Sequence, residues 1–482
     1  MHFDIISAFP EFFDVLQLSL VGKAQQRGII STEIHDIRDW TQDIHRTVDD
    51  SPFGGGAGMV MKPDVWAQAI DAAIDKISAP TVLAIPTPSG IPLTQRHCER
   101  LANVEHIILA CGRYEGIDSR IAQYYSARAD VEVFEFSLGD YVLNGGEVAS
   151  VALVEAVSRL VPGMVGNPQS LAEESHSEAG LLEYPVYTRP ADFRGIAVPE
   201  VLTSGNHQAV HRWRRDRSLE RTAQRRPDMI AQLKATQLDK GDLEELARWG
   251  WFCAQDGEHV EKLVFRAART DDVVALAEFA RRTFVDACPP SIAERERENF
   301  IEKNLSAEQF STYVADEDTY SVLLAEDSSA QIAGYMLYEH GDLTAQIAAG
   351  APQGFVIDGV PFDGRFIYMS KAYVDQRWRS RYVFSTLFEF SVQSLRAKLG
   401  VDALLDKSGV DGDAGECSTH QDCESVSVPK PWCIWLGTHE HNRRAQKAYR
   451  KLGFVRAGKR EFRVGDTINN DVTMVRPLNV AK

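Results

Sequence analysis

Three glycine-containing segments each follow a short apolar run of the kind that forms a buried strand. They are residues 87–93 (TPSGIPL), 111–118 (CGRYEGID) and 137–147 (SLGDYVLNGGE). Glycine has no side chain, so it lets a ligand come close to the backbone. Where three strands end at one edge of an α/β sheet, their loops build a small-molecule site. The pattern therefore predicts a binding site at the carboxyl edge of a sheet.

A second chemical feature is a stripe of arginines between residues 211 and 226. They are Arg212, Arg214, Arg215, Arg217, Arg221, Arg225 and Arg226. The net charge of the whole chain is −17, but a local basic stripe is the relevant footprint for phosphate binding. Only Asp216 and Glu220 accompany these arginines, so we favour phosphate contacts over intrahelical pairs such as Arg212 with Asp216. Such binding should weaken sharply with salt.

A third feature is a helical pattern near the C-terminal end. Ala445, Ala448, Tyr449 and Leu452 follow the spacing i, i+3, i+4, i+7, and Gly453 is a natural helix stop. On this spacing alone, Tyr449 is a good candidate for a core aromatic on the buried face of the helix.

Alternating strand and helix patterns position these groups. We expect strands at 3–7 and 29–37, helices at 11–26, 63–77 and 147–160, and a glycine-rich loop at 49–59. This alternation favours an α/β fold with a mainly parallel sheet that is covered on both faces. Residues 180–247 look mostly helical. A third unit should contain strands at 263–266, 321–325, 333–339 and 366–374 and a helix at 271–287.

Length and composition set the class of protein. A chain of 482 residues suggests two or three domains, and 44% hydrophobic with 25% charged residues are globular values. We see no membrane-spanning stretch and no leader, so we expect a cytoplasmic protein with seven reduced cysteines. Cys417, His420, Cys423 and Cys433 are of types that zinc accepts, but their spacing matches no standard zinc module, and we assign no metal ligands.

Residues 1 to about 247 resemble the bacterial tRNA (guanine-N1)-methyltransferases of the trefoil-knot (SPOUT) class. The resemblance rests on HRTVDD at 45–50, GGGAGM at 54–59, the loops at 111–118 and 137–147, VSRLVPG at 157–163 and LTSGNH at 202–207. It implies a knotted S-adenosylmethionine-binding domain at 1–165, a linker at 166–180 and a helical tRNA-binding domain at 181–250. It also implies an interlocked homodimer with its active site at the interface, and assistance by Mg²⁺.

The same resemblance implies which residues contact the methyl donor, largely through main-chain groups. The predicted contacts are Pro88, Gly90, Gly112, Tyr114, Glu115, Leu138, Gly139, Asp140, Tyr141, Val142, Leu143, Gly145 and Gly146. For any single glycine, relief of a tight turn is an alternative explanation.

Methylation of guanine N1 needs a base that accepts the N1 proton and a group that stabilises the negative charge developing on O6. The family places its catalytic aspartate before a serine, and here that pair reads Glu174-Ser175. Compared with aspartate, glutamate has one more carbon, which moves its carboxylate oxygens by about 1.5 Å. Arg159 matches the family arginine that stabilises negative charge on the guanine oxygen O6. The alternative interpretation of Glu174 is a solvated loop acid, and that of Arg159 is an arginine favoured at a helix C-terminus. In this family the C-terminal domain binds the anticodon branch of tRNA at the place of the arginine stripe. The resemblance therefore implies RNA contacts by Arg212, Arg214, Arg215, Arg221 and Arg225.

After a linker at 251–262, residues 263–482 resemble the GNAT-type N-acetyltransferases, through the strand WCIWLGT at 432–438, Asn442, Tyr449 and the pair Gly453-Phe454. The resemblance implies acetyl-coenzyme A as donor, Asn442 against its arm and Tyr449 as the acid that protonates the thiolate. Its pyrophosphate loop should lie at 379–385, where Tyr382 and Phe384 stand in place of glycines. Arg377, Arg379 and Arg381 should partly compensate by direct charge.

The sequence thus predicts a fusion. Its first part methylates N1 of the guanine that follows the anticodon, position 37, and its second part is an acetyltransferase whose acceptor is a polyamine, a protein amine or none. Two alternatives stay open: the second part is an inactive binding or scaffold module, or the first part methylates another RNA.

Overall fold

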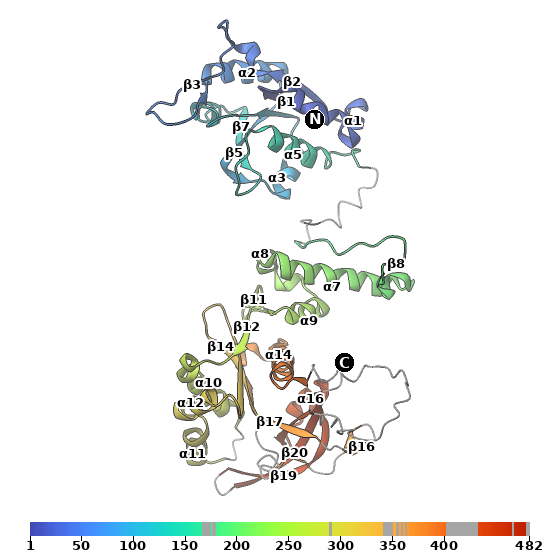
Figure 1. The fold of residues 1–482 in the computed structure, drawn as a ribbon, viewed down its shortest axis with the longest axis vertical. Coiled ribbons are helices and arrows are strands. Elements are labelled where there is room, and N and C mark those ends of the chain that lie inside the picture. Colours follow the sequence, from blue (N-terminus) through green and yellow to red (C-terminus); the bar gives the residue numbers. More distant parts are fainter. Residues whose placement is uncertain are drawn as a thin grey trace, which may run out of the picture. The chain divides into compact units, whose positions relative to one another are not determined.

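The computed structural model describes residues 1–165, 175, 180–288, 292–340, 350–352, 356–357, 360–361, 364–401, 432–464 and 467–478. The chain divides into two compact units, which we call unit 1 (Met1–Ala179) and unit 2 (Gly180–Lys482). Figure 1 shows the elements of both units. None of the described helices is long and apolar enough to cross a membrane.

Unit 1 is built on a parallel sheet of five strands in the order β2-β1-β6-β5-β7. These strands are β1 (His2–Ser7), β2 (Ser31–Asp36), β5 (Thr81–Pro92), β6 (His106–Ala110) and β7 (Val131–Ser137). All four pairings between neighbours are parallel. The predicted parallel α/β sheet is therefore confirmed.

Helices cover both faces of this sheet, as the strand-helix alternation predicted. One apolar cluster contains Phe3 and Ile5 of β1 with residues of η1 (Pro10–Gln17), α1 (Ser19–Gln26), α3 (Gln95–Leu101) and α5 (Glu147–Ser158). The other contains Ile6 of β1 with residues of α2 (Pro63–Lys76) and α4 (Arg120–Ser126). Alternate residues of a strand point to opposite faces, so β1 contributes to both clusters. The remaining elements are η2 (Ile37–Trp40) and the pair β3 (Asp49–Asp50) and β4 (Val60–Met61).

The single helix expected at residues 11–26 is wrong, because two shorter helices form there. Leu18 is extended between η1 and α1, and Ser19 has a φ of 53°. A Cβ at Gly22 would lie 2.0 Å from the carbonyl oxygen of Gln17, so the backbone at this break packs too closely for a side chain.

The first part of unit 2 is mainly helical, as expected. It contains α7 (His207–Arg225), α8 (Pro227–Ala231) and α9 (Lys240–Arg248), the short helices η3 (Glu200–Thr203) and η4 (Ala235–Gln237), and the small pair β8 (Asp192–Phe193) and β9 (Ile196–Ala197). Residues 251–262, expected as a linker, form a hairpin of β10 (Trp251–Cys253) and β11 (Val260–Lys262).

The rest of unit 2 is built on a seven-stranded sheet in the order β12-β13-β14-β17-β18-β20-β19. Its strands are β12 (Val264–Ala267), β13 (Tyr320–Glu326), β14 (Ile332–Glu339), β17 (Arg365–Val374), β18 (Trp432–His439), β19 (Val455–Val464) and β20 (Thr467–Pro477). The helices are η5 (Thr270–Asp272), α10 (Val273–Ala287), α11 (Glu294–Asn304), α12 (Ala307–Ala315), η6 (Gln376–Trp378), α14 (Val383–Lys398) and α16 (Arg443–Lys451). Strands β15 (Val356–Ile357) and β16 (Val360–Pro361) form a separate pair.

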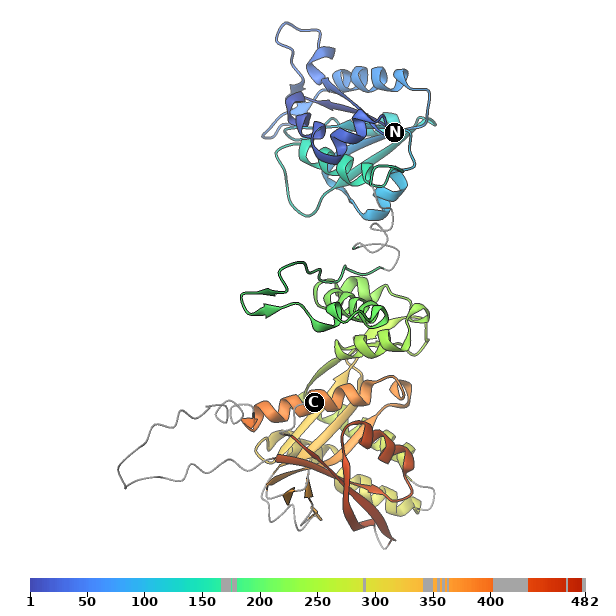
Figure 2. The ribbon, with the colours of Figure 1, turned by 90° about the vertical axis from the view of Figure 1, so that its right-hand side faces the viewer.

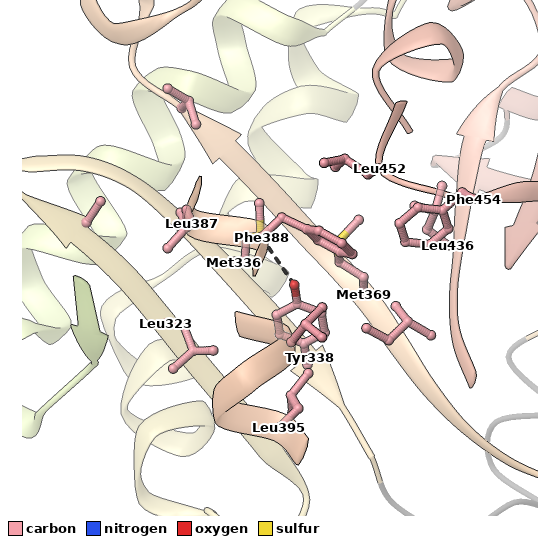
Figure 3. Packing of buried hydrophobic residues seen from close by; sticks show 14 of the residues in the cluster. Leu323, Met336, Tyr338, Met369, Leu387, Phe388, Leu395, Leu436, Leu452 and Phe454 are labelled. Carbon is pink, nitrogen blue, oxygen red and sulfur yellow. Dashed lines mark hydrogen bonds between the residues drawn. The ribbon is translucent and has the colours of Figure 1, made fainter. Parts of the chain in front are cut away.

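Helices α10 and α12 pack on one face of this sheet, and α14 packs on the other. Figure 2 shows α14, in orange, crossing the strands. Figure 3 shows Phe388, Leu387 and Leu395 of α14 among side chains of the sheet, and Phe454, which follows α16, in the same cluster. The hydroxyl of Tyr338 is buried there and donates a hydrogen bond to the sulfur of Met336 (3.2 Å). Phe252 of the hairpin belongs to this cluster too, so the hairpin shares the core of the seven-stranded sheet.

Candidate functional site

The three predicted loops of unit 1 lie at the carboxyl ends of sheet strands, and we call residues 86–93, 111–118 and 137–146 the edge loops. Residues 111–118 follow β6, residues 137–146 begin at the last residue of β7, and residues 86–93 form the irregular last part of β5. Strand β5 pairs with β7 through Pro86, skips residues 87–90, and pairs again from Ile91. Gly112 accepts a hydrogen bond from the amide of Gly146 (2.9 Å). Neighbouring strands thus bring the edge loops together, as the strand pattern predicted.

Two predicted donor-contact glycines are explained by backbone packing. A Cβ at Gly146 would lie 2.6 Å from Pro86 Cγ and 3.0 Å from Cys111 Cα, where the three edge loops meet. A Cβ at Gly90 would lie 2.5 Å from the backbone of Phe136. At these two positions the turn-and-packing explanation holds, and contact with a ligand is an additional prediction.

Large side chains of the edge loops point away from the core. Tyr114 is 63% exposed and Val142 is 79% exposed, and Tyr141 and Leu143 are exposed as well. Tyr114 also has a φ of 59°, in the left-handed region that L residues occupy only at a cost. Exposed apolar groups beside close-packed backbone suit a site that a ligand or a second chain covers.

An ion pair that the sequence did not reveal links the edge loop at residues 111–118 to the first residue of α5. Arg113 Nε donates to Glu147 Oε1 at 3.1 Å, and Ser7 Oγ donates to the same oxygen at 2.9 Å. Glu147 is 1% exposed, and the guanidinium of Arg113 lies 4.4 Å from the ring centroid of Phe9. An acid in the first turn of a helix is too common to announce such a pair from sequence.

The glycine-rich segment at 54–59 joins the same site. The amide of Glu115 donates to the carbonyl of Met59 (2.9 Å), and the amide of Met61 donates to the carbonyl of Gly116 (2.9 Å). Gly58 has a φ of +93°, and a Cβ there would lie 2.2 Å from Glu115 Oε1. The segment is therefore held against the edge loop at residues 111–118.

Of the two predicted catalytic residues of unit 1, Arg159 lies within the described residues, at the opposite end of α5 from the edge loop at residues 137–146. Arg159 follows the last residue of α5, whereas the loop at residues 137–146 precedes its first residue. Twelve helical residues span about 18 Å. Glu174 lies outside the described residues, as do Cys417, His420 and Cys423.

In the arginine stripe, acids from α9 pair with residues of α7. Arg212 Nη2 lies 2.5 Å from Asp216 Oδ1 and 2.8 Å from Asp242 Oδ1, and Arg215 Nη2 lies 2.9 Å from Asp242 Oδ2. Counting acids along the sequence missed Asp242, so the argument against internal pairing is wrong for these two arginines. It is wrong for Arg217 and Arg226 as well, which pair with Glu220 and Asp228. Arg221 donates to the carbonyl of Glu183 (2.9 Å), the guanidinium of Arg214 lies 4.8 Å from the ring centroid of Tyr184, and Arg225 is exposed.

The seven-stranded sheet of unit 2 opens between β17 and β18. This parallel pair is in register only from Arg365 with Trp432 to Tyr368 with Trp435, although β17 continues to Val374 and β18 to His439. Both strands then border an open cavity, which is also lined by the predicted face of α16: Ala445, Ala448, Tyr449 and Leu452. Asn442 lines the cavity and caps α16 by accepting from the amide of Ala445 (3.0 Å).

Two polar groups of this cavity favour a ligand. Burial raises the pKa of Tyr449 to about 12, so its phenol keeps a proton to donate. Ser370, at the irregularity where β17 pairs with β14, has a buried hydroxyl with no partner among the described residues, and it also lines the cavity. A buried hydroxyl without a partner costs about 1–3 kcal/mol, which a bound ligand would offset.

The loop before α14 is the segment where a pyrophosphate site was expected, with glycines at the positions of Tyr382 and Phe384. Tyr382 has a φ of 67°, in the left-handed region that favours glycine, whereas Phe384 lies inside α14. Ser380, with a φ of 65°, is a second left-handed position in this loop. Arg381 donates to the carbonyl of Cys253 (2.8 Å) and to that of Ala254, so its guanidinium is held against the hairpin β10–β11, and the compensating role expected for it stays a prediction.

Unit 1 is thus an α/β domain with a candidate ligand site at the carboxyl edge of a parallel sheet. A family model described as tRNA (Guanine-1)-methyltransferase TrmD matches residues 1–232. A tRNA (guanine-N(1)-)-methyltransferase of Bifidobacterium animalis subsp. lactis is 51% identical over 276 residues, 99% of that protein and 55% of this chain. One from Leifsonia xyli subsp. xyli is 56% identical over 230 residues, all of that protein and 48% of this chain. The chain belongs to the tRNA (guanine-N1)-methyltransferase family, whose membership implies S-adenosylmethionine as methyl donor.

Proposed function

We propose that unit 1, with the helical part of unit 2, transfers a methyl group from S-adenosylmethionine to N1 of the guanine that follows the anticodon of tRNA, position 37. The observation that carries this proposal is the match to nearly the full length of named tRNA methyltransferases. The edge loops lie within residues 1–232, which match the family model. The edge loops hold the methyl donor, and Glu174 takes the N1 proton while Arg159 steadies the charge on O6. The trefoil knot and Mg²⁺ assistance remain predictions from the family.

The active form is a homodimer with its site at the interface. Arg159 lies at the far end of α5 from the edge loops, so a second copy has to supply it there. Large apolar side chains are exposed on η1, α1 and α5, which pack together: Phe12, Val15, Leu20 and Val148. An exposed apolar surface of this kind is typical of a protein interface.

The test uses the full-length protein, labelled S-adenosylmethionine and two tRNA transcripts that differ only by guanine or adenine after the anticodon. Methyl incorporation should be confined to the guanine transcript. Glu174→Gln should lower the single-turnover rate roughly 10²–10⁴-fold while S-adenosylmethionine affinity stays unchanged, because the amide keeps the shape and loses the base. Incorporation into both transcripts, or an active Glu174→Gln, would contradict the proposal.

A second function is favoured for unit 2, namely binding of an acyl-coenzyme A and acetyl transfer to an amine. The opening between β17 and β18 leaves strand backbone unpaired along the cavity, where an extended thioester arm can add its own hydrogen bonds. Tyr449 would protonate the leaving thiolate. Calorimetry with acetyl-coenzyme A tests the binding step, and Tyr449→Phe should retain binding and lose transfer. Absence of binding heat would leave unit 2 as a scaffold.

A further inference from the structure

A buried carboxylate lies in unit 1 near the amino ends of the strands, away from the edge loops. Asp4 of β1 is fully buried. Its Oδ2 lies 2.8 Å from His106 Nε2 and 3.3 Å from His2 Nε2, and its Oδ1 lies 2.5 Å from His35 Nε2. Each carboxylate oxygen of Asp4 therefore has a histidine nitrogen within hydrogen-bond distance, and the carboxylate is shielded from solvent.

The register of the sheet brings these residues together although they are far apart in the sequence. His2 pairs with both Ser31 and His106, and His106 pairs with Thr81. These four are the first residues of β1, β2, β6 and β5, so they form one row across the sheet. Because side chains alternate between faces, Asp4 points to the same face as His2.

A hydroxyl group orients each of the two histidines nearest Asp4 Oδ2. His106 Nδ1 lies 2.9 Å from Thr81 Oγ1, and His2 Nδ1 lies 2.6 Å from Ser31 Oγ. Both rings therefore present Nε2 to the carboxylate while the other nitrogen is held. Metal-binding histidines have this same arrangement, in which an outer hydrogen bond sets the tautomer and the ring orientation.

The charge of Asp4 also calls for a cation. Within the described ranges, its ion-pair partners are histidines alone, and the neighbouring acid Glu33 pairs with Lys76. An ionised carboxylate is costly to bury unless a charge compensates it. A bound metal ion supplies such a charge and takes its ligands from both the carboxylate and the imidazoles.

We propose that His2 Nε2, Asp4 Oδ2 and His106 Nε2 bind one divalent transition-metal ion of the zinc class, with water as a fourth ligand. Ligands about 2.0–2.1 Å from tetrahedral Zn²⁺ lie about 3.3 Å apart. The two carboxylate-to-imidazole distances, 2.8 and 3.3 Å, require only a small adjustment, and the three donor atoms lie within 4.8 Å of one another. The side chain of His2 is 21% exposed, which gives the ion a path of entry.

This site is separate from the proposed methyl-transfer site, and its effect is structural. The ion would clamp β1 to β6 at the amino edge of the sheet, and His35 would keep the second oxygen of Asp4 in place. Nitrogen and oxygen ligands of this kind accept Zn²⁺ and Co²⁺ in the same geometry.

The test titrates Co²⁺ into untagged full-length protein after chelator treatment and follows the visible absorption of tetrahedral cobalt. Cys417→Ser and Cys423→Ser are included in every sample, so that thiolate ligands at those positions do not contribute. We expect one Co²⁺ per chain, displaced by Zn²⁺, and a rise in the melting temperature with Zn²⁺ because the ion binds the folded state. His2→Gln should weaken Co²⁺ binding roughly tenfold or more and abolish the Zn²⁺-dependent rise.

His207→Gln is the matched control, since His207 is exposed on α7. It should leave both readouts unchanged. His106→Asn tests the buried ligand, and His2→Gln keeps the test valid if that variant does not fold. A wild-type protein that binds no Co²⁺, or a cobalt spectrum and affinity unchanged in His2→Gln, would overturn the proposal and leave protonated imidazole as the charge partner of Asp4.

Discussion

Arg113 and Glu147 form an ion pair that links the edge loop at residues 111–118 to the first turn of α5. Helix α5 follows directly after the edge loop at residues 137–146. The two residues belong to the loop after β6 and to α5, and their side chains meet at 3.1 Å with Glu147 almost wholly buried. Ser7, at the end of β1, donates to the same carboxylate oxygen. Three strand ends therefore depend on one buried carboxylate for their relative positions.

Glu147→Gln should destabilise unit 1 by about 2–4 kcal/mol and weaken S-adenosylmethionine binding about tenfold, because it leaves Arg113 without its charge partner and loosens the edge loops. Glu132→Gln is the matched control, since it breaks the exposed pair Arg100–Glu132, which should cost less than about 1 kcal/mol. Chemical unfolding and calorimetry with S-adenosylmethionine measure both effects. Equal losses in the two variants would contradict this role of Glu147.

In the arginine stripe, Arg225 and Arg212 should behave differently. Arg225 is exposed, so Arg225→Ala should weaken tRNA binding and reduce the slope of log affinity against log salt by about 0.7–0.9 with no loss of stability. Arg212→Ala should lower the melting temperature instead, because it removes a partner of the buried acid Asp242. Filter binding over a salt series, with thermal melts, distinguishes the two, and a salt slope unchanged in Arg225→Ala would remove Arg225 from the RNA contact.

The left-handed backbone at Ser380 predicts that glycine is the better residue there. Ser380→Gly should stabilise the protein by about 0.5–1 kcal/mol, because a positive φ costs conformational free energy in an L residue and not in glycine. Ser385→Gly, in the helix α14 that follows, should destabilise it by about 1 kcal/mol. Thermal melts should show shifts of opposite sign. If acyl-coenzyme A binds as proposed, Ser380→Gly should also tighten its binding.

Lys371 lines the unit 2 cavity and should make stability depend on alkaline pH. Burial lowers its pKa from 10.5 to about 8, and the charge of Glu339 offsets only part of this. Below about pH 8 the folded protein bears the cost of a buried ammonium group, which is relieved as pH rises toward 10.5 because the unfolded chain then binds more protons. Lys371→Met should therefore be more stable than the wild type at about pH 7, by roughly 1–3 kcal/mol, and this gain should shrink near pH 10.

Unfolding free energies of wild type and Lys371→Met at both pH values measure this difference. Lys303→Met, at an exposed position of α11, should change stability little and equally at both. A gain that does not depend on pH would mean that the ammonium group is solvated.

Local patterns predicted much of the fold. The apolar runs predicted β1, β5 and β14, the i, i+3, i+4 spacing predicted α16, and Gly453, with a φ of +85°, ends that helix as expected. Glycine-containing segments after the strands predicted the edge loops. These features depend on residues close together in the sequence, whose periodicity records which side is buried.

Tertiary structure alone decided the pairings between distant residues. Asp242 neutralises arginines of α7 from a different helix, Glu147 joins Arg113, and the register of four parallel strands places His2 and His106 around Asp4. The sequence also did not reveal where β17 and β18 part, because strand propensity continues past that point. Composition and spacing specify which side chains are present and which face they occupy, but strand register and helix packing determine which charges meet, and a buried charge is stable only beside the partner that the fold supplies.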